Sequence, residues 1–225
     1  MSGPSPPVGT VRLVDDVAAA FTEVVAAEAP ASFALSGGGT ARRCYQALAA
    51  AGSDALDWSG VTVLFGDERW VPVSSPDSNE GMARRVLLDA VAPAEVRSLR
   101  GAGASPEEAA VAYDTALASL PGPDVVHLGL GDDGHTASLF PGSPALAVDD
   151  RLVVATGDGA HPHRRLTFTF PAIARARLVI VTVSGAAKVE AWRRLCRGDD
   201  VPAARIRAER VCWLVDPAAA GGNRE

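Results

Sequence analysis

The chain has 225 residues, of which 48% are hydrophobic, and a formal net charge of −6. This size is enough for one α/β domain with a buried core, and the negative charge argues against nucleic acid or an anionic membrane as a partner, since both need a basic face. No apolar run approaches the length of a membrane span, and the start of the chain lacks the basic residues and apolar core of a signal peptide. The three cysteines lack the short paired spacing of a zinc site, so we expect a cytoplasmic protein without a metal site.

Apolar segments that predict strands alternate along the chain with amphipathic segments that predict helices. This alternation is typical of a Rossmann-like α/β fold, in which a mostly parallel sheet is flanked by helices on both faces. We expect a single domain over residues 11–219, a disordered N-terminal tail over 1–10 and a flexible C-terminal tail over 220–225.

In chain order, the predicted elements are a helix over 15–28, a strand over 32–35, a helix over 40–51, a strand over 61–65, helices over 77–89 and 106–120, strands over 124–128, 152–155, 166–170 and 178–183, a helix over 186–196, and a strand over 211–215. We place the strand over 124–128 at the centre of the sheet and expect the strand over 211–215 to close it.

Glycines fill the turn between the first predicted strand and the helix that follows it. Gly37, Gly38 and Gly39 free backbone N–H groups ahead of Thr40, and the N-terminus of the helix adds partial positive charge. Arg42 lies one turn into the helix and could add a cationic contact. The segment has neither the Gly-Lys-Ser/Thr ending of a P-loop nor the spacing of a dinucleotide fingerprint. We interpret it as a phosphate site, and the alternative is a tight turn with surface arginines.

Three consecutive ionisable residues, Asp67, Glu68 and Arg69, follow the second predicted strand. Ligands of open parallel sheets sit beyond the carboxyl ends of the strands, so we expect this segment at the same edge of the sheet as the glycine turn. The flanking glycine, tryptophan and proline predict a fixed, partly enclosed loop, whereas the alternative is an ordinary solvated loop. Asn79 would bind the ligand or cap the helix that follows it.

The segment from Gly129 to Pro141, GLGDDGHTASLFP, directly follows the predicted central strand. Its glycines can adopt φ > 0 and let a ligand approach the backbone, and His135 is the side chain whose unperturbed pKa lies nearest neutral pH. With two carboxylates before it, this histidine suits a small-molecule active site. For the segment taken alone, a capped turn with a surface histidine is the alternative.

Several segments in a fixed order resemble those of the 6-phosphogluconolactonases: SGGGT, GDERWVP followed by DSN and GMARR, LGLGDDGHTASLFPG, RRLTFTFPAI, SGAAK and VCWLVD. The resemblance covers nearly all of residues 11–219, and ordered matches are far more specific than any one of them. It implies the sugar-phosphate isomerase-like fold that this family shares with glucosamine-6-phosphate deaminases. One departure is Ala41, where a proline often stands; since proline there only preorganises the start of the helix, little changes.

The resemblance implies a cofactor-free enzyme of the oxidative pentose phosphate pathway that hydrolyses 6-phospho-D-glucono-1,5-lactone to 6-phospho-D-gluconate. His135 matches the family's general base for the attacking water, a role that needs a neutral imidazole. Asp67 and Asp133 are the candidates for orienting the imidazole or the water and for binding sugar hydroxyls, and the sequence leaves their roles open. Arg69 would face the developing oxyanion or the phosphate.

The substrate phosphate would lie at the glycine turn, with Arg165 and Lys188 as further ligands. Arginine offers a bidentate fork and lysine a point charge, so the two are complementary. A local cluster of cations also reconciles an anionic substrate with an acidic chain. The sequence does not separate phosphate ligands from oxyanion donors among Arg69, Arg165 and Lys188. The resemblance further suggests a monomer or a weak homodimer.

The competing hypotheses are a glucosamine-6-phosphate isomerase or deaminase on the same fold and a non-catalytic sugar-phosphate-binding domain. Deaminases of this kind typically carry a glutamate just before the proline that ends the histidine segment, and Phe140 stands there instead. A sensor domain would be expected to lose His135 or Asp67 and to carry a DNA-binding module. This chain keeps both residues and leaves no room for the module, so we favour hydrolysis.

Overall fold

The computed structural model describes residues 7–101, 103–157 and 162–222. Most of the two predicted tails, residues 1–6 and 223–225, lies outside the described residues. Of the remainder, Thr10 begins strand β1 (Thr10–Leu13) and Ala220 ends helix α8 (Pro217–Ala220).

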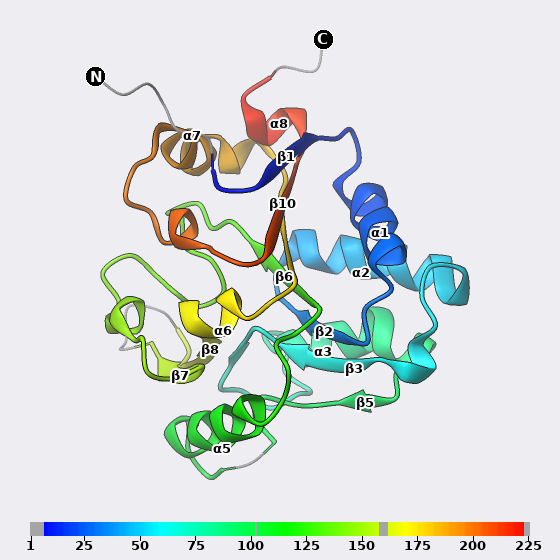
Figure 1. Ribbon diagram of the computed structural model, residues 1–225, viewed down its shortest axis with the longest axis vertical. Helices are drawn as coiled ribbons and strands as arrows, with labels where there is room; N and C mark the ends of the chain where they lie inside the picture. Colours follow the sequence, from blue (N-terminus) through cyan, green and yellow to red (C-terminus); the bar gives the residue numbers. More distant parts are fainter. Residues whose placement is uncertain (1–6, 102, 158–161, 223–225) are drawn as a thin grey trace.

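Seven parallel strands form the main sheet, in the order β1-β10-β9-β6-β2-β3-β5 (Figure 1). Besides β1 they are β2 (Ser32–Leu35), β3 (Thr62–Phe65), β5 (Glu95–Val96), β6 (Val125–Gly129), β9 (Leu178–Val183) and β10 (Arg210–Val215). The predicted Rossmann-like α/β class is confirmed, as is the central position of β6. The prediction that β10 closes the sheet is wrong, because β1 pairs on its outer side.

The parallel register brings the carboxyl ends of the inner strands to one edge of the sheet. Leu35 of β2 lies beside Phe65 of β3, and Gly129 of β6 lies beside Thr182 of β9. The glycine turn, the segment that begins at Asp67 and the histidine segment therefore all leave the sheet at this edge, where open α/β sheets bind their ligands.

Helices flank the sheet, and several of them begin at side-chain caps. They are α1 (Val17–Glu28), α2 (Gly39–Ala51), α3 (Asn79–Ala83), a π-helical turn (Arg84–Leu88), α4 (Asp89–Val91), α5 (Pro106–Ala118), α6 (Phe170–Ala174), α7 (Val189–Arg197) and α8. Asp16 Oδ1 accepts hydrogen bonds from the N–H groups of Ala18 and Ala19, which fixes the start of α1. The helix predicted over 186–196 is divided into a 3₁₀ turn (Ala186–Lys188) and α7.

Large side chains from α1, α2 and β2 form a continuous part of the core. Phe21, Phe33 and Tyr45 are fully buried, and the rings of Phe33 and Tyr45 lie 6.2 Å and 6.1 Å from that of Phe21. Burying each such ring stabilises the fold by about 1.5–3 kcal/mol. This packing holds α2 rigidly against the sheet, and with it the glycine turn from which α2 starts.

A second, antiparallel sheet of three strands stands beside the main one. It consists of β4 (Asp67–Arg69), β8 (Arg165–Phe168) and β7 (Val153–Thr156), in that order. The sequence predicted these last two strands without separating them from the main sheet, and the structure pairs them antiparallel in this second sheet. The strand predicted over 166–170 also ends early, because Thr169 Oγ1 accepts a hydrogen bond from the Ala172 N–H and starts α6. In this sheet Arg69 pairs with Arg165.

Candidate active site

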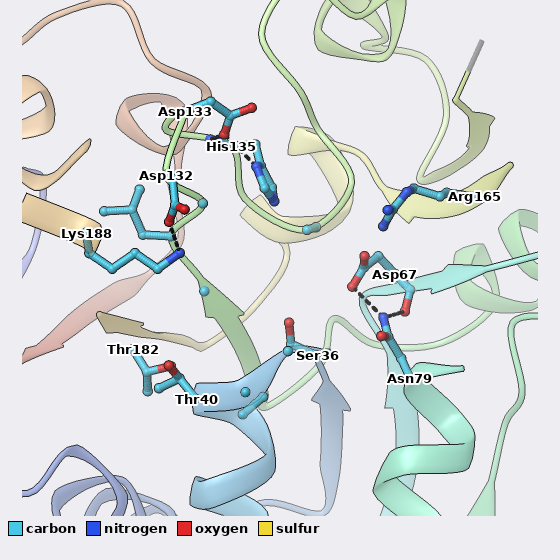
Figure 2. A pocket seen from close by; sticks show the side chains of 18 of the residues that line it. Ser36, Thr40, Asp67, Asn79, Asp132, Asp133, His135, Arg165, Thr182 and Lys188 are labelled. Atoms are coloured by element: carbon cyan, nitrogen blue, oxygen red, sulfur yellow. Dashed lines mark hydrogen bonds and ion pairs between the residues drawn. The ribbon is translucent and has the colours of Figure 1, made fainter. Parts of the chain in front are cut away.

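The carboxyl edge of the main sheet and the end of the small sheet enclose a cavity of about 570 Å³. The three polar segments that the sequence singles out all line it (Figure 2). All of the predicted catalytic and binding residues except Arg42 belong to its lining: Gly37, Gly38, Gly39, Thr40, Asp67, Arg69, Asn79, Asp133, His135, Arg165 and Lys188.

Arg42 is not brought to the cavity, and its side chain is exposed on α2. Thr40 lines the cavity. In an α-helix, side chains two positions apart point about 200° away from each other around the helix axis. Arg42 therefore lies on a different face of α2 from Thr40. Sequence proximity to the glycine turn suggested a contact that the helical period does not allow.

Asp133 and His135 form a close polar pair in the cavity. Asp133 Oδ1 lies 2.6 Å from His135 Nδ1 and accepts a second hydrogen bond, at 3.0 Å, from the backbone N–H of the same residue. Partial burial alone raises the pKa of Asp133, but the hydrogen bonds and charge of His135 outweigh this and lower it. With Nδ1 donating to the carboxylate, the Nε2 lone pair of the imidazole is left toward the cavity, into which Figure 2 shows the ring pointing.

The turn that holds His135 depends on glycine at two positions. A Cβ on Gly131 would lie 2.0 Å from His135 Nδ1, and Gly134 has a φ of +90°. The Gly131 N–H also donates to the His135 carbonyl at 2.8 Å, which closes the turn. The ring of Phe140, nearly buried, also lies 4.5 Å from the imidazole. The imidazole is therefore packed against both the turn backbone and an aromatic ring.

Asp67 belongs to a different network from His135. Its Oδ2 accepts a hydrogen bond from Ser138 Oγ at 2.7 Å, and its Oδ1 accepts one from Asn79 Nδ2 at 3.2 Å. Asn79 Nδ2 also donates to the Asp67 backbone carbonyl at 2.9 Å. Only 5% of Asp67 is exposed. The carboxylate that contacts the imidazole is thus Asp133, a distinction that the sequence left open.

Glu68, which the sequence did not single out as a site residue, supports this part of the cavity from beneath. Its carboxylate accepts four hydrogen bonds of 2.7–2.9 Å, from the N–H groups of Arg69, Asn79 and Glu80 and from Ser78 Oγ. Burial raises its pKa, although these hydrogen bonds oppose the shift. The signal for this role was the helix start at Ser78–Glu80, whose free N–H groups attract a carboxylate.

The glycine turn forms an open helix N-terminus on the floor of the cavity. No side chain of the described residues caps α2, whose N-cap is Gly38 with a φ of +96°, and the first N–H groups of a helix have no partner within it. Gly37 allows the turn to approach Asn79, since a Cβ there would lie 1.9 Å from Asn79 Oδ1. The turn is thus fixed against α3 while its N–H groups remain available to an anion.

The two predicted phosphate cations lie on opposite sides of the cavity. Figure 2 shows Lys188 on the side of Thr40 and Thr182, and Arg165 on the side of Asp67 and Asn79. Lys188 Nζ lies 2.5 Å from Asp132 Oδ1. Thr182 was not predicted, although its position beside Gly129 at the end of β9 follows from the register. We had assigned both cations to one phosphate, which this separation does not favour.

Arg165 and Arg69 are neighbours at the other side. Arg69 Nη1 donates to the Asp77 carbonyl at 2.8 Å, which ties it to the loop before α3. Arg165 Nη1 lies 3.5 Å from Ser138 Oγ, and its guanidinium carbon lies 5.2 Å from the centre of the Phe140 ring. Burial lowers the pKa of Arg165, while the Asp67 charge opposes the shift. This side of the cavity therefore holds two guanidinium groups near the buried carboxylate of Asp67.

Among the described residues, no three His, Cys, Asp or Glu side chains gather as a metal ion would need. Nor does any helix there have the length and apolar character to cross a bilayer.

Known proteins identify the family. The family model of glucosamine-6-phosphate isomerases/6-phosphogluconolactonase matches residues 9–213, which include every segment that lines the cavity. The chain belongs to this family. A curated relative from Synechocystis sp., named 6-phosphogluconolactonase, is 41% identical over 214 residues, which are 88% of this chain and 87% of the relative.

Solved structures of the family share the fold. A 6-phosphogluconolactonase from Leishmania guyanensis has a TM-score of 0.82 and 28% identity, covering 97% of this chain and 100% of that one. A monomeric glucosamine-6-phosphate deaminase has the same TM-score at 21% identity, covering 94% and 99% of the two chains, a likeness of fold alone. The fold is thus common to both activities, and the side chains of the site must decide between them.

Proposed function

We propose that this chain hydrolyses 6-phospho-D-glucono-1,5-lactone to 6-phospho-D-gluconate, as in the oxidative pentose phosphate pathway. The observation that carries the proposal is the contact of 2.6 Å between Asp133 and His135 in a cavity that also holds an uncapped helix N-terminus. A base and an anion site in one cavity suit a substrate with a carbonyl to attack and a phosphate to hold. Membership in the family supports the same substrate.

The phosphate is placed at the start of α2 and at Lys188. The N–H groups that follow Gly38 have no partner within the helix, so they can donate hydrogen bonds to an anion. The helix dipole adds positive charge at the same place. Lys188 lines the same side of the cavity and is paired with Asp132, so the phosphate would compete with that carboxylate for the ammonium. The lactone ring then extends from this end toward His135.

His135 acts as the general base. Its Nε2 takes a proton from a water molecule whose oxygen bonds to C1 of the lactone, and the carbonyl oxygen becomes an oxyanion. Asp133 holds the Nδ1–H and stabilises the imidazolium that forms. When the intermediate collapses, the C1=O bond is restored, the bond from C1 to the ring oxygen breaks, and that oxygen takes the proton from the imidazolium.

Arg165, with Arg69 beside it, is assigned to the lactone end. It lies across the cavity from Lys188, so a phosphate at Lys188 leaves this guanidinium free to face the developing oxyanion or the ring hydroxyls. Asp67 and Asn79 are joined to each other and point into the same side of the cavity, where they would bind hydroxyls. We further expect the protein to act as a monomer or weak homodimer in the cytoplasm.

The side chain at position 140 argues against an amino-sugar phosphate isomerase. A ring-opening isomerase needs an acid near the histidine, and the resemblance places that acid at residue 140. Here Phe140 is a nearly buried phenyl ring 4.5 Å from the imidazole, which can neither donate nor accept a proton. The site therefore keeps the base for hydrolysis and lacks this acid.

The deciding experiment follows lactone disappearance, with the lactone made in situ from glucose 6-phosphate and with spontaneous hydrolysis subtracted. We expect the wild type to accelerate hydrolysis and His135→Ala to lose about 10²-fold or more of that rate. Glucosamine 6-phosphate serves as the second substrate. A wild type no faster than buffer on the lactone would refute the proposal, and turnover of the amino sugar would replace it.

A further inference from the structure

A buried chain of hydrogen bonds runs beneath the end of the cavity where the phosphate is placed. The Ser36 N–H donates to Tyr45 Oη at 2.7 Å, and Tyr45 Oη lies 2.9 Å from His127 Nδ1. On the other edge of the ring, His127 Nε2 lies 2.9 Å from Thr182 Oγ1. Tyr45 and His127 are fully buried. The chain thus links β2, α2, β6 and β9 through side chains that the proposed reaction does not use.

The direction of each hydrogen bond in this chain is determined by its first member. A backbone N–H can only donate, so Tyr45 Oη accepts from Ser36. The phenol then needs an acceptor for its own proton, and among the described residues only His127 Nδ1 lies within hydrogen-bonding distance to accept it. A buried hydroxyl without an acceptor is costly, so Nδ1 accepts and the imidazole carries its proton on Nε2.

This tautomer determines whether the Thr182 hydroxyl offers the cavity a hydrogen-bond donor or only an acceptor. The Nε2–H donates to Thr182 Oγ1, so the hydroxyl proton cannot point back to the ring and is left for another acceptor. Thr182 lines the cavity on the same side as Thr40 and Lys188 (Figure 2). With the opposite tautomer the hydroxyl would donate to the ring and present only lone pairs to the cavity, which repel an anion.

We propose that Tyr45 and His127 are positioning residues that fix Thr182 as a hydrogen-bond donor to the substrate phosphate. The inference rests on the proposed function for the identity of the anion, and on the hydrogen-bond chain for the direction of the donor. It assigns Thr182 to the binding site and gives the buried pair a role beyond packing. The same chain anchors the glycine turn, because Ser36 immediately precedes it.

The buried pair stays neutral, which keeps this arrangement constant. Burial lowers the pKa of His127 to about 3 and raises that of Tyr45 well above its usual value. The Phe21 ring, 4.4 Å from the imidazole, covers it. An imidazolium would donate at both nitrogens and lose the hydrogen bond from Tyr45, so a ring that does not protonate near neutral pH preserves the chain.

The first test is ¹⁵N NMR of histidine-labelled wild-type protein, in which the two ring nitrogens of His127 report which one is protonated. We expect Nε2 to be protonated and Nδ1 to be bare, with and without inorganic phosphate. A proton on Nδ1 would overturn the inference. This readout needs no turnover, so it stands even if the proposed function fails.

The second test compares Thr182→Val with Thr182→Ser in titrations with inorganic phosphate. Loss of a hydrogen bond to a charged group should weaken phosphate binding by about tenfold or more in the valine variant, and serine should restore it. In turnover, Thr182→Val should raise KM for the phosphorylated lactone by a much larger factor than KM for unphosphorylated glucono-1,5-lactone. Equal losses on both lactones, or unchanged phosphate affinity, would contradict the proposal.

Tyr45→Phe tests the positioning role, with Tyr113→Phe as the matched control. Both variants remove a buried phenol hydroxyl, but Tyr113 bonds to the backbone of Phe65 and Arg97, away from this chain. We expect Tyr45→Phe to weaken phosphate binding and to allow both tautomers of His127, and Tyr113→Phe to do neither. Equal effects of the two would reduce Tyr45 to a packing role. If Tyr45→Phe does not fold, the wild-type spectrum and the Thr182 pair still decide.

Discussion

One carboxylate oxygen of Asp133 contacts His135 twice, at 2.6 Å from the ring Nδ1 and 3.0 Å from the backbone nitrogen. The ring orientation and the turn geometry therefore depend on the same atom. In Asp133→Asn the amide oxygen can still accept both hydrogen bonds, but the negative charge that stabilises an imidazolium is gone. We expect kcat to fall by about 10²-fold or more with little change in KM.

The control for that variant is Asp132→Asn, which removes a charge one residue away. Asp132 contacts Lys188 rather than His135, so kcat should remain near the wild-type value. Steady-state kinetics on the phosphorylated lactone measures both variants. If the two lost kcat equally, the effect would be one of net charge and Asp133 would have no special role.

Lys188 and Arg165 should respond differently to removal of the substrate phosphate. Lys188→Met is expected to raise KM for the phosphorylated lactone by about tenfold or more, because a charge-assisted contact is lost, and to leave glucono-1,5-lactone hydrolysis unchanged. Arg165→Met should slow both lactones, since it faces the ring on the other side of the cavity. Kinetics on the two substrates separates the roles, and an Arg165→Met defect confined to the phosphorylated lactone would move the phosphate to that side.

Gly131→Ala should disable the enzyme without unfolding it. The new Cβ would lie 2.0 Å from His135 Nδ1, so the ring must leave its place beside Asp133. We expect kcat to drop by about 10²-fold, as for loss of the base. Gly60→Ala is the control, because its Cβ would meet nothing within 4 Å. Steady-state kinetics and thermal unfolding of both variants check this. A fully active Gly131→Ala would contradict the prediction, because it would show that the turn shifts to accommodate the added Cβ.

The raised pKa of Glu68 should make the free energy of unfolding depend on pH. Burial raises its pKa above the ordinary 4.5, so between these two values the folded chain holds a proton that the unfolded chain has lost. The contribution of Glu68 to the free energy of unfolding is therefore greatest at a pH below its pKa in the unfolded chain. It falls as the pH rises through its pKa in the folded chain. Glu68→Gln removes that slope. Urea unfolding from about pH 4 to about pH 7 should show the free-energy difference, wild type minus variant, decreasing with pH, and a constant difference would contradict this.

The sequence predicted the central strand and the cavity edge because these depend on local patterns. The apolar run that ends at Leu128 is typical of a buried strand, and the glycines after it mark a turn at its carboxyl end. By the same reasoning, β1 was missed because its four residues are exposed and show no buried pattern.

The pairing of side chains within the site could not be read from spacing alone. Asp67 and Asp133 both follow strands. Only the tertiary structure shows that Asp67 is hydrogen-bonded to Ser138 and Asp133 to His135. The resemblance placed Arg165 with Lys188 at the phosphate. The strand that carries Arg165 belongs instead to the small antiparallel sheet, where it pairs with β4.

The cavity has two walls of different origin. The main sheet supplies the glycine turn and Thr182, while the ribbon formed by β4 and β8 supplies Asp67 and Arg165. On the proposed assignment, substitutions in the ribbon change the contacts with the sugar ring, while the phosphate site and His135, which follow strands of the main sheet, stay as they are. The two ends of the substrate can therefore be altered independently.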